Sequence, residues 1–213
     1  MTQIKSRDRV RDLAEVYTNE REVNAMLDLI PIRNPDDILT YTYLEPACGN
    51  GNFLIEILRR KLKRVHEKFK NKNLSSYELN IAKVLSTIYG IDICNENVEE
   101  SRARLFTEVK AFFDTHKGSY LYSHGFLGLV DYILKANIVV GDTINRPADI
   151  KISQFKFSRS DVHQLIFKFS DLSQQIPLPI EILPEKNFLL IGIEHENSTG
   201  VIHAGIQGHF NFI

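Results

Sequence analysis

Short apolar runs and longer amphipathic segments alternate along the first 142 residues of the chain. Continuous apolar runs bounded by turn residues predict buried strands at 38–45, 88–93 and 137–142. Apolar residues at helical spacing predict helices at 1–31, 52–70, 76–87 and 95–113. This alternation is typical of an α/β fold, in which a parallel sheet carries helices on both faces.

Capping and turn residues predict where these elements end. Thr18 suits the N-cap of a helix that continues through Val23 and Leu27, and Pro31 closes that segment. Residues 114–130 contain glycines and aromatics, and we expect them to form a connection between elements.

The last third of the chain has a different pattern. Residues 151–213 contain short apolar runs that predict strands, and two of these, 188–193 and 201–206, flank a glycine-containing turn as a β-hairpin. The C-terminal hairpin could complete the sheet, or pair with a protein partner or a second copy in a homodimer. The sequence thus divides into an N-terminal helical segment, a core and a divergent C-terminal part, at 1–36, 37–150 and 151–213.

Composition limits the class of protein. The 213 residues are 43% hydrophobic and 25% charged, which suits one ordinary core. No apolar run has the length of a transmembrane helix and no signal peptide is visible, so we expect a cytoplasmic protein without membrane contact. The net charge of −1 does not favour nucleic acid, except at the basic stretch Arg59–Lys72. That stretch could contact DNA phosphates or form the solvated face of a helix.

The segment Leu44–Leu54 carries the clearest chemical signal. It predicts a strand end, a glycine loop and a helix start, where Gly49 and Gly51 would let a ligand approach the backbone closely. Glu45 would repel a phosphate, which favours a cationic ligand with a free amine. The loop therefore indicates S-adenosylmethionine more than ATP or NAD, and the alternative is an ordinary glycine turn.

The same string resembles a known cofactor loop. Glu-Pro-Ala-Cys-Gly-Asn-Gly-Asn-Phe-Leu is similar to the loop of the S-adenosylmethionine-dependent N6-adenine DNA methyltransferases of restriction–modification systems. Their usual loop reads Asp-Pro-Ala-Cys-Gly-(Thr/Ser)-Gly-x-Phe-Leu, so Glu45 and Asn50 are departures from it. The resemblance implies a Rossmann-like methyltransferase fold and cofactor contacts from Glu45, Pro46, Ala47, Cys48, Gly49, Gly51 and Phe53.

A second part of the resemblance precedes the loop. Glu-Val-Tyr-Thr, followed by a helix, is similar to the segment that covers the methionine end of the cofactor in these enzymes. It implies that Tyr17 and Thr18 contact the cofactor, although Asn19 replaces the usual proline. The alternative is a core tyrosine beside a helix cap.

Acids at the ends of the second and third predicted strands extend the site. Asp92 follows the second strand, where an acid can accept both hydroxyls of a ribose, or it could cap the next helix. Ile93 follows it. By resemblance, Asp142 would contact the adenine amino group, and Thr143 or Ile144 would pack against the ring.

One catalytic motif of the family was not found. These methyltransferases carry (Asp/Asn/Ser)-Pro-Pro-(Tyr/Phe) after their fourth strand, where it accepts protons from the target amine and stacks on the flipped base. Residues 143–213 contain no Pro-Pro pair, and the strand predicted at 162–166 is followed by no proline motif. The catalytic residues therefore remain unknown. Two hypotheses follow: a DNA adenine N6-methyltransferase of a restriction–modification or mobile-element system, or a non-catalytic descendant acting as a regulatory subunit or decoy.

Other reactive side chains predict less. Cys48 and Cys94 lack metal-ligand spacing and are expected to be reduced thiols. Cys48 could be a nucleophile or simply a small residue in a tight loop. The histidines of the C-terminal part are expected to be structural or solvent-facing, and no metal site is predicted: His163, His195, His203 and His209.

Overall fold

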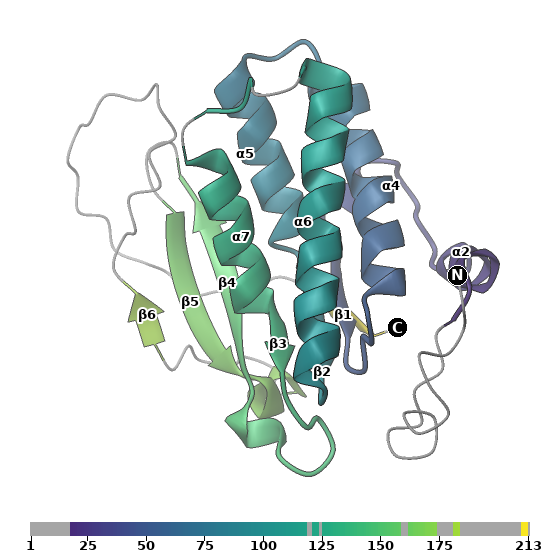
Figure 1. Cartoon of the computed structure of the whole chain (residues 1–213), viewed down its shortest axis with the longest axis vertical. Helices are drawn as coiled ribbons and strands as arrows, with labels where there is room; N and C mark the ends of the chain where they lie inside the picture. Colours follow the sequence, from purple (N-terminus) through teal and green to yellow (C-terminus); the bar gives the residue numbers. More distant parts are fainter. Residues whose placement is uncertain are drawn as a thin grey trace.

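The computed structural model describes residues 18–118, 121–123, 125–158, 162–173, 181–183 and 210–212 (Figure 1). Tyr17 and the predicted hairpin at 188–206 lie outside the described residues. The helices are α2 (Glu20–Leu27), α3 (Asp37–Thr40), α4 (Asn52–Phe69), α5 (Leu74–Leu85), α6 (Asn95–Lys117) and α7 (Phe126–Asn137). The strands are β1 (Thr42–Glu45), β2 (Ile88–Asp92), β3 (Ile138–Val140), β4 (Lys151–Phe157), β5 (Val162–Lys168), β6 (Glu181–Leu183) and β7 (Phe210–Phe212).

A parallel sheet of four strands, in the order β3-β2-β1-β7, organises the described fold. Leu44 of β1 lies opposite Tyr89 of β2 on one side and opposite Phe212 of β7 on the other. Asp92, at the end of β2, lies opposite Val140 of β3. All four strands run in the same direction, so their carboxyl ends share one edge. The structure confirms an α/β protein with a parallel sheet.

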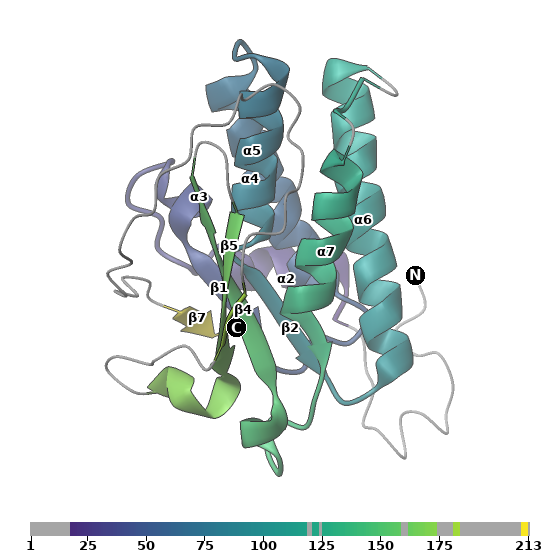
Figure 2. The ribbon, with the colours of Figure 1, turned by 90° about the vertical axis from the view of Figure 1, so that its left-hand side faces the viewer.

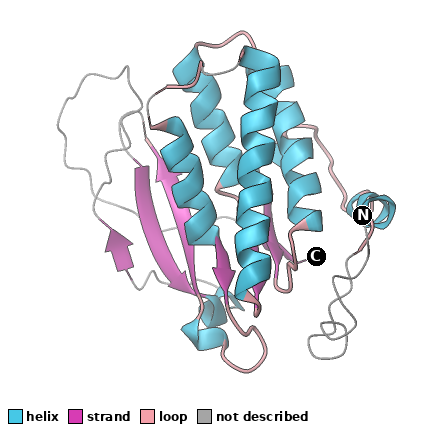
Figure 3. Cartoon of the chain, in the orientation of Figure 1, coloured by secondary structure: helices cyan, strands magenta, loops and turns pink. Residues whose placement is uncertain are grey.

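Helices cover one face of this sheet. Figures 1 and 3 show α4, α5, α6 and α7 side by side as a layer, and Figure 2 shows the same layer from the side. Tyr43 and Ile88 belong to the core that these helices form. Gly90 lets α4 approach β2, because a Cβ atom there would lie 2.6 Å from Leu54 Cδ1. This packing fixes α4 behind the edge where β1 and β2 end.

The opposite face corrects a prediction. We expected helices on both faces, but in the described residues β4 and β5 cover the second face. Tyr89 Oη also donates a hydrogen bond of 2.8 Å to Ser153 O of β4. The alternate residues of the parallel strands pack there in a second core with this strand pair: Leu44, Tyr89, Ile91, Ile152 and Leu165. An antiparallel pair with one apolar face can bury a sheet as a helix does.

Several predicted boundaries also move. Residues 37–40 form the one-turn helix α3, so the first strand begins at Thr42 and not at residue 38. Asn19, not Thr18, caps α2, because its side chain accepts the hydrogen bond of Glu22 N. Helix α7 was predicted as a connection; Gly118 and Gly125, with φ of 98° and 93°, separate it from α6.

The fourth strand of the parallel sheet is also not the predicted one. Residues 162–168 form β5, which pairs antiparallel with β4 and β6 in a separate sheet. The position beside β1 belongs to β7, whose carboxyl end reaches the same edge as Glu45. Strand order depends on long-range pairing, which local sequence patterns do not encode.

Candidate functional site

Main-chain hydrogen bonds bring the predicted site residues together at the carboxyl edge of the sheet. Cys48 N donates to Ile91 O at 2.9 Å, which joins the glycine loop to β2. Gly141 N donates to Asp92 O at 2.9 Å, which joins the segment after β3 to the end of β2. Three successive strand ends therefore meet beside the start of α4.

The carboxylate of Asp92 holds the glycine loop and the segment after β2 together. Its Oδ2 accepts a hydrogen bond of 2.8 Å from Gly49 N, and its Oδ1 accepts one of 2.8 Å from Cys94 N and a longer one from Asn97 Nδ2. Asp92 is not the N-cap of α6, which is Cys94, but its carboxylate joins the turn before that helix to the glycine loop. Because a carboxylate oxygen has two acceptor positions, Oδ2 keeps one for a ligand donor.

The glycine loop requires its glycines. Gly49 and Gly51 adopt φ of 53° and 86°, in the left-handed region where other residues are strained. A Cβ atom on Gly51 would also lie 2.3 Å from Ser101 Oγ of α6. The loop is thus shaped both by backbone conformation and by close contact with α6.

Charge at the loop is negative and partly buried. Glu45 is only 9% exposed and accepts a hydrogen bond of 3.2 Å from Ala47 N. Burial raises the pKa of Glu45, the bond from Ala47 opposes this, and the Asp92 charge adds to it. Burial, with the charges of Asp92 and Glu45, also raises the pKa of Cys48. Cys48 is therefore a protonated thiol packed in the loop, not an activated nucleophile.

The remaining loop residues take different positions. Phe53, in the first turn of α4, packs against the main core, and Ala47 is exposed. Pro46 O accepts a hydrogen bond of 3.4 Å from Thr143 Oγ1, which links the glycine loop to the segment after β3.

The segments after β2 and β3 present apolar surface at this edge. Ile93 is 60% exposed directly after Asp92, and Ile144 is 87% exposed. Asp142 shapes its own turn, because its carboxylate accepts hydrogen bonds from Ile144 N and from the backbone and side chain of Asn145. The bonds from Asn145 are the main reason why the pKa of Asp142 is lowered. Exposed aliphatic side chains beside carboxylates suit a flat ring that carries polar substituents.

Thr18, two residues before the start of α2, lies in the same region. Its carbonyl accepts a hydrogen bond of 2.9 Å from Asn52 Nδ2, at the first residue of α4. Asn52 Oδ1 in turn accepts from Arg104 Nη1 of α6 at 2.9 Å. Sequence reasoning missed Asn52, Ser101 and Arg104, because their roles arise from α6 packing against α4 and no local motif marks them.

The basic stretch is less positive than its sequence indicated. Arg59 pairs with Glu108, Arg60 with Asp28 and Glu56, and both Arg64 and Lys68 with Asp36. Lys61 is fully buried, whereas Lys63 and Lys72 are exposed. Most of the cationic side chains that could contact DNA phosphates here are already paired with carboxylates.

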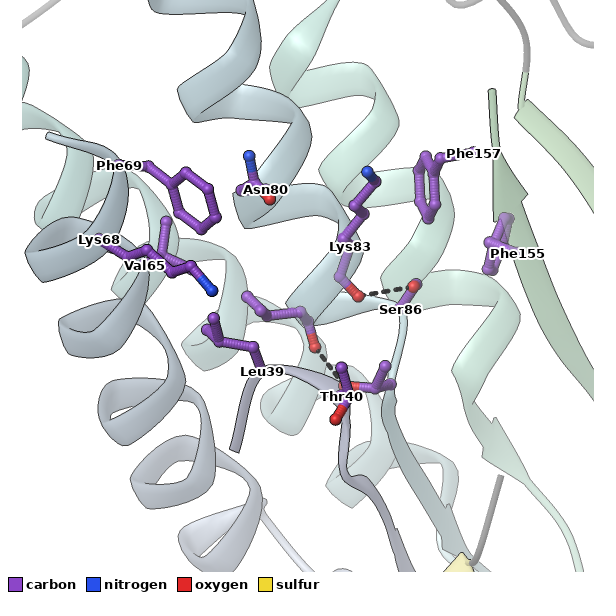
Figure 4. A pocket seen from close by; sticks show the side chains of 12 residues that line it. Leu39, Thr40, Val65, Lys68, Phe69, Asn80, Lys83, Ser86, Phe155 and Phe157 are labelled. Atoms are coloured by element: carbon purple, nitrogen blue, oxygen red, sulfur yellow. Dashed lines mark hydrogen bonds between the residues drawn. The ribbon is translucent and has the colours of Figure 1, made fainter. Parts of the chain in front are cut away.

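A cavity lies at the opposite, amino-terminal edge of the sheet. It has a volume of about 440 Å³ and opens between α4, α5 and β4. Figure 4 shows Phe69 on one side and Phe155 and Phe157 on the other, with Asn80 and Lys83 between them. It lies apart from every residue of the predicted site.

The described residues contain neither a group of metal ligands nor a membrane-spanning helix. There, no three His, Cys, Asp or Glu side chains form a group that could hold a metal ion. His163 lies on β5, and His195, His203 and His209 fall outside the part of the chain that the structure describes. No helix in that part has the length and apolar character needed to cross a bilayer.

Comparison with known proteins adds no assignment. No protein-family model matches the chain, and no curated protein matches its sequence at a significant level. The class of molecule that the fold defines is an α/β protein with a parallel sheet and an acidic glycine-loop site at its carboxyl edge.

Proposed function

We propose that this chain binds S-adenosylmethionine at the carboxyl edge of a Rossmann-like methyltransferase fold and serves methyl transfer to the N6 amino group of adenine in DNA. The observation that carries the proposal is the hydrogen bond from Gly49 N to Asp92, beside the exposed Ile93. This bond brings the glycine loop, an acceptor position on Asp92 Oδ2 and the apolar side chain of Ile93 into one small area. The resemblance of Glu45–Leu54 to an adenine methyltransferase loop supports the same ligand.

The charges of the site support a cationic cofactor. S-adenosylmethionine carries a sulfonium and an ammonium group, and Glu45, Asp92 and Asp142 are carboxylates around the loop. A nucleotide phosphate would instead meet these three negative groups, and the Arg104 guanidinium beside the loop already donates hydrogen bonds to Asn50 O and Asn52 Oδ1. The N-terminus of α4 alone would favour an anion, so the carboxylates decide the preference.

Each end of the cofactor has residues that suit it. Asp92 would accept hydrogen bonds from the ribose hydroxyls, while Ile93 and Thr143 or Ile144 would hold the adenine ring and Asp142 its amino group. Glu45–Phe53 and Thr18 would hold the methionine part. The bound cofactor would supply an electrophilic methyl group, and the chain's contribution would be to orient it.

Residues 143–213 contain no Pro-Pro-aromatic motif, and this absence speaks against catalysis by this chain alone. The strand that lies beside β1 is β7, and the strand predicted at 162–166 belongs to the other sheet. A non-catalytic regulatory subunit that retains the cofactor site is the alternative, and an activity assay separates the two.

Calorimetric titration of the purified chain with S-adenosylmethionine and S-adenosylhomocysteine tests cofactor binding. We expect micromolar affinity that is lost in Gly49→Val and Asp92→Ala but kept in Asp131→Asn, a surface acid on α7 that pairs with Lys135. Absence of binding at millimolar ligand would refute the proposal. Methyl transfer to adenine in DNA would then favour the enzyme, and binding without transfer would favour the regulatory subunit.

A further inference from the structure

Arg104 of α6 is an unusual cation in this fold. It is partly buried, burial lowers its pKa, and the charge of Glu100 opposes this effect without a direct hydrogen bond between the two side chains. Its Nη1 instead donates 2.6 Å and 2.9 Å hydrogen bonds to Asn50 O and Asn52 Oδ1. Because both hydrogens of Nη1 bond to neutral acceptors, the guanidinium is suited to fixing the positions of these two residues rather than to neutralising a charge.

The neighbouring residues of α6 hold the same loop. Glu100, one turn before Arg104, accepts a hydrogen bond of 3.0 Å from Asn50 Nδ2. Ser101 lies against Gly51 without space for a Cβ atom. Glu100 and Ser101 precede Arg104 by four and three residues, so each lies next to Arg104 on the helix surface. This part of α6 therefore packs against the glycine loop and forms hydrogen bonds with it.

Asn52 connects α6 to the N-terminal segment through two hydrogen bonds of its side chain. Its side chain accepts from Arg104 and donates to Thr18 O at 2.9 Å, so one amide joins α6, the start of α4 and the residue before α2. Further along, Arg60 Nη2 donates to the Asn24 side chain at 2.7 Å and keeps α2 against α4. The Asn52 bond acts on Thr18 itself, whereas the Arg60 contacts hold α2 further along.

The strand order places Thr18 at one particular end of the proposed ligand. Asp92 and Ile93 follow β2, and Asp142 follows β3, whereas the glycine loop and Thr18 lie on the β1 side. A nucleoside with its adenine at Asp142 and its ribose at Asp92 would therefore direct its 5′ substituent toward the glycine loop and Thr18.

We infer that Arg104 and Asn52 are positioning residues, which hold Thr18 over the amino-acid end of the cofactor and leave the adenosine end unaffected. This inference rests on the proposed function. It assigns the selection for a ligand that carries a methionine tail to Arg104 of α6 and to Asn52, a variable position of the glycine-loop string.

Calorimetry with three ligands tests the inference: S-adenosylmethionine, S-adenosylhomocysteine and 5′-methylthioadenosine, which lacks the amino-acid tail. Asn52→Asp keeps an acceptor for Arg104 but removes the donor to Thr18 O, and Arg104→Gln removes the guanidinium. We expect each to weaken the two tailed ligands about tenfold and methylthioadenosine less than about twofold. Lys110→Gln, which removes another cation of α6 that pairs with Asp114, should change none of the affinities.

Hydrogen exchange and thermal unfolding complete the experiment. In Asn52→Asp the amides of Glu20–Val23 should exchange faster while the unfolding midpoint of the whole chain stays close to that of the wild type. An equal loss for all three ligands, or no loss for any, would overturn the positioning role while leaving the proposed function in place. A wild-type chain that binds none of the three ligands would overturn both.

Discussion

Ile93 is the residue where a ligand contact can be tested with least disturbance of the fold. Its side chain is 60% exposed, so little packing is lost when it is shortened. We expect Ile93→Ala to leave the unfolding midpoint unchanged and to weaken S-adenosylmethionine about tenfold, because burying an aliphatic side chain is worth about 1.5–3 kcal/mol. Titration calorimetry measures the change. Leu121→Ala is the matched control, since Leu121 is equally exposed but lies between α6 and α7. Unchanged affinity in Ile93→Ala would remove Ile93 from the site.

At Glu45 we expect the charged carboxylate to lower the stability of the fold and to favour cofactor binding. Burial raises its pKa, so the folded chain binds a proton more readily than the unfolded chain and loses stability as the pH rises through that pKa. We expect Glu45→Gln to unfold at a higher temperature than the wild type at pH 7.5, with the difference shrinking toward pH 4. The amide can still accept the bond from Ala47 N.

The same variant should bind the cofactor less well. Loss of the carboxylate should weaken cationic S-adenosylmethionine more than neutral methylthioadenosine, as measured by calorimetry at pH 7.5. A variant that is less stable than the wild type at neutral pH would contradict the buried-charge argument, and equal loss for both ligands would contradict the electrostatic one.

The sequence predicted the residues of the site that belong to short local strings. Glu45, Gly49 and Asp92 follow apolar runs, and parallel strands bring such ends to one edge. Arg104 was not predicted, because an arginine in the middle of an amphipathic helix has the same local pattern whether it faces solvent or a loop. Its role depends on how α6 packs against α4.

At the scale of the element, the contact between the start of α4 and α6 can be measured. Gly51→Ala places a side chain at φ of 86° and within 2.3 Å of Ser101 Oγ, so we expect clear destabilisation in urea unfolding. Ser101→Ala should be nearly neutral, since Ser101 Oγ has no hydrogen-bond partner. The double variant should relieve the contact with Ser101 Oγ but keep the close approach of 3.1 Å to the Cβ atom of residue 101, together with roughly 1–2 kcal/mol of backbone strain. Strict additivity of the two single changes would show that the clash does not exist.

Lys61 holds the connection from α3 to β1 against α4. It is fully buried, donates hydrogen bonds of 2.6 Å to both Ile38 O and Tyr41 O, and burial lowers its pKa to about 7. Above pH 7 the folded chain has released a proton that the unfolded chain still holds, so rising pH favours folding. Relative to Lys61→Met, the wild type should gain stability from pH 7 to 10, by up to about 1.4 kcal/mol per pH unit. Urea midpoints that keep a constant difference over this range would mean that the two carbonyls keep Lys61 charged.

The elements themselves were predicted unevenly, for physical reasons. The helices at 52–70 and 95–113 have long amphipathic patterns, and the structure places α4 and α6 there. Helix α7 was missed although Phe126, Leu129 and Val130 have helical spacing, because the glycines before it indicated a connection. In the structure those glycines end one helix and begin the next. The covering of the second face by β4 and β5 could not be predicted, since a short apolar strand pattern does not specify its partner.

At the scale of the whole molecule, the parallel sheet separates two places where a ligand could bind. The proposed cofactor site lies at the carboxyl ends of β1, β2 and β3, and the cavity of about 440 Å³ lies at their amino ends beside Lys83 and Phe157. A ligand that binds only the folded chain stabilises it wherever it binds. Ligand-induced stabilisation therefore reveals binding, and substitutions at each edge show the location.

Thermal unfolding with S-adenosylmethionine at about a hundred times its dissociation constant should stabilise the chain by about 2.7 kcal/mol. For a chain of this size that corresponds to a rise in the unfolding midpoint of roughly 5–10 °C. Asp92→Asn should abolish most of the rise, because it removes the carboxylate at the junction of the glycine loop and β2. Lys83→Gln, at the opposite edge, should leave the rise intact. If Lys83→Gln abolished it and Asp92→Asn did not, the ligand would occupy the amino-terminal cavity, and the carboxylates at the carboxyl edge would serve only to hold the loop.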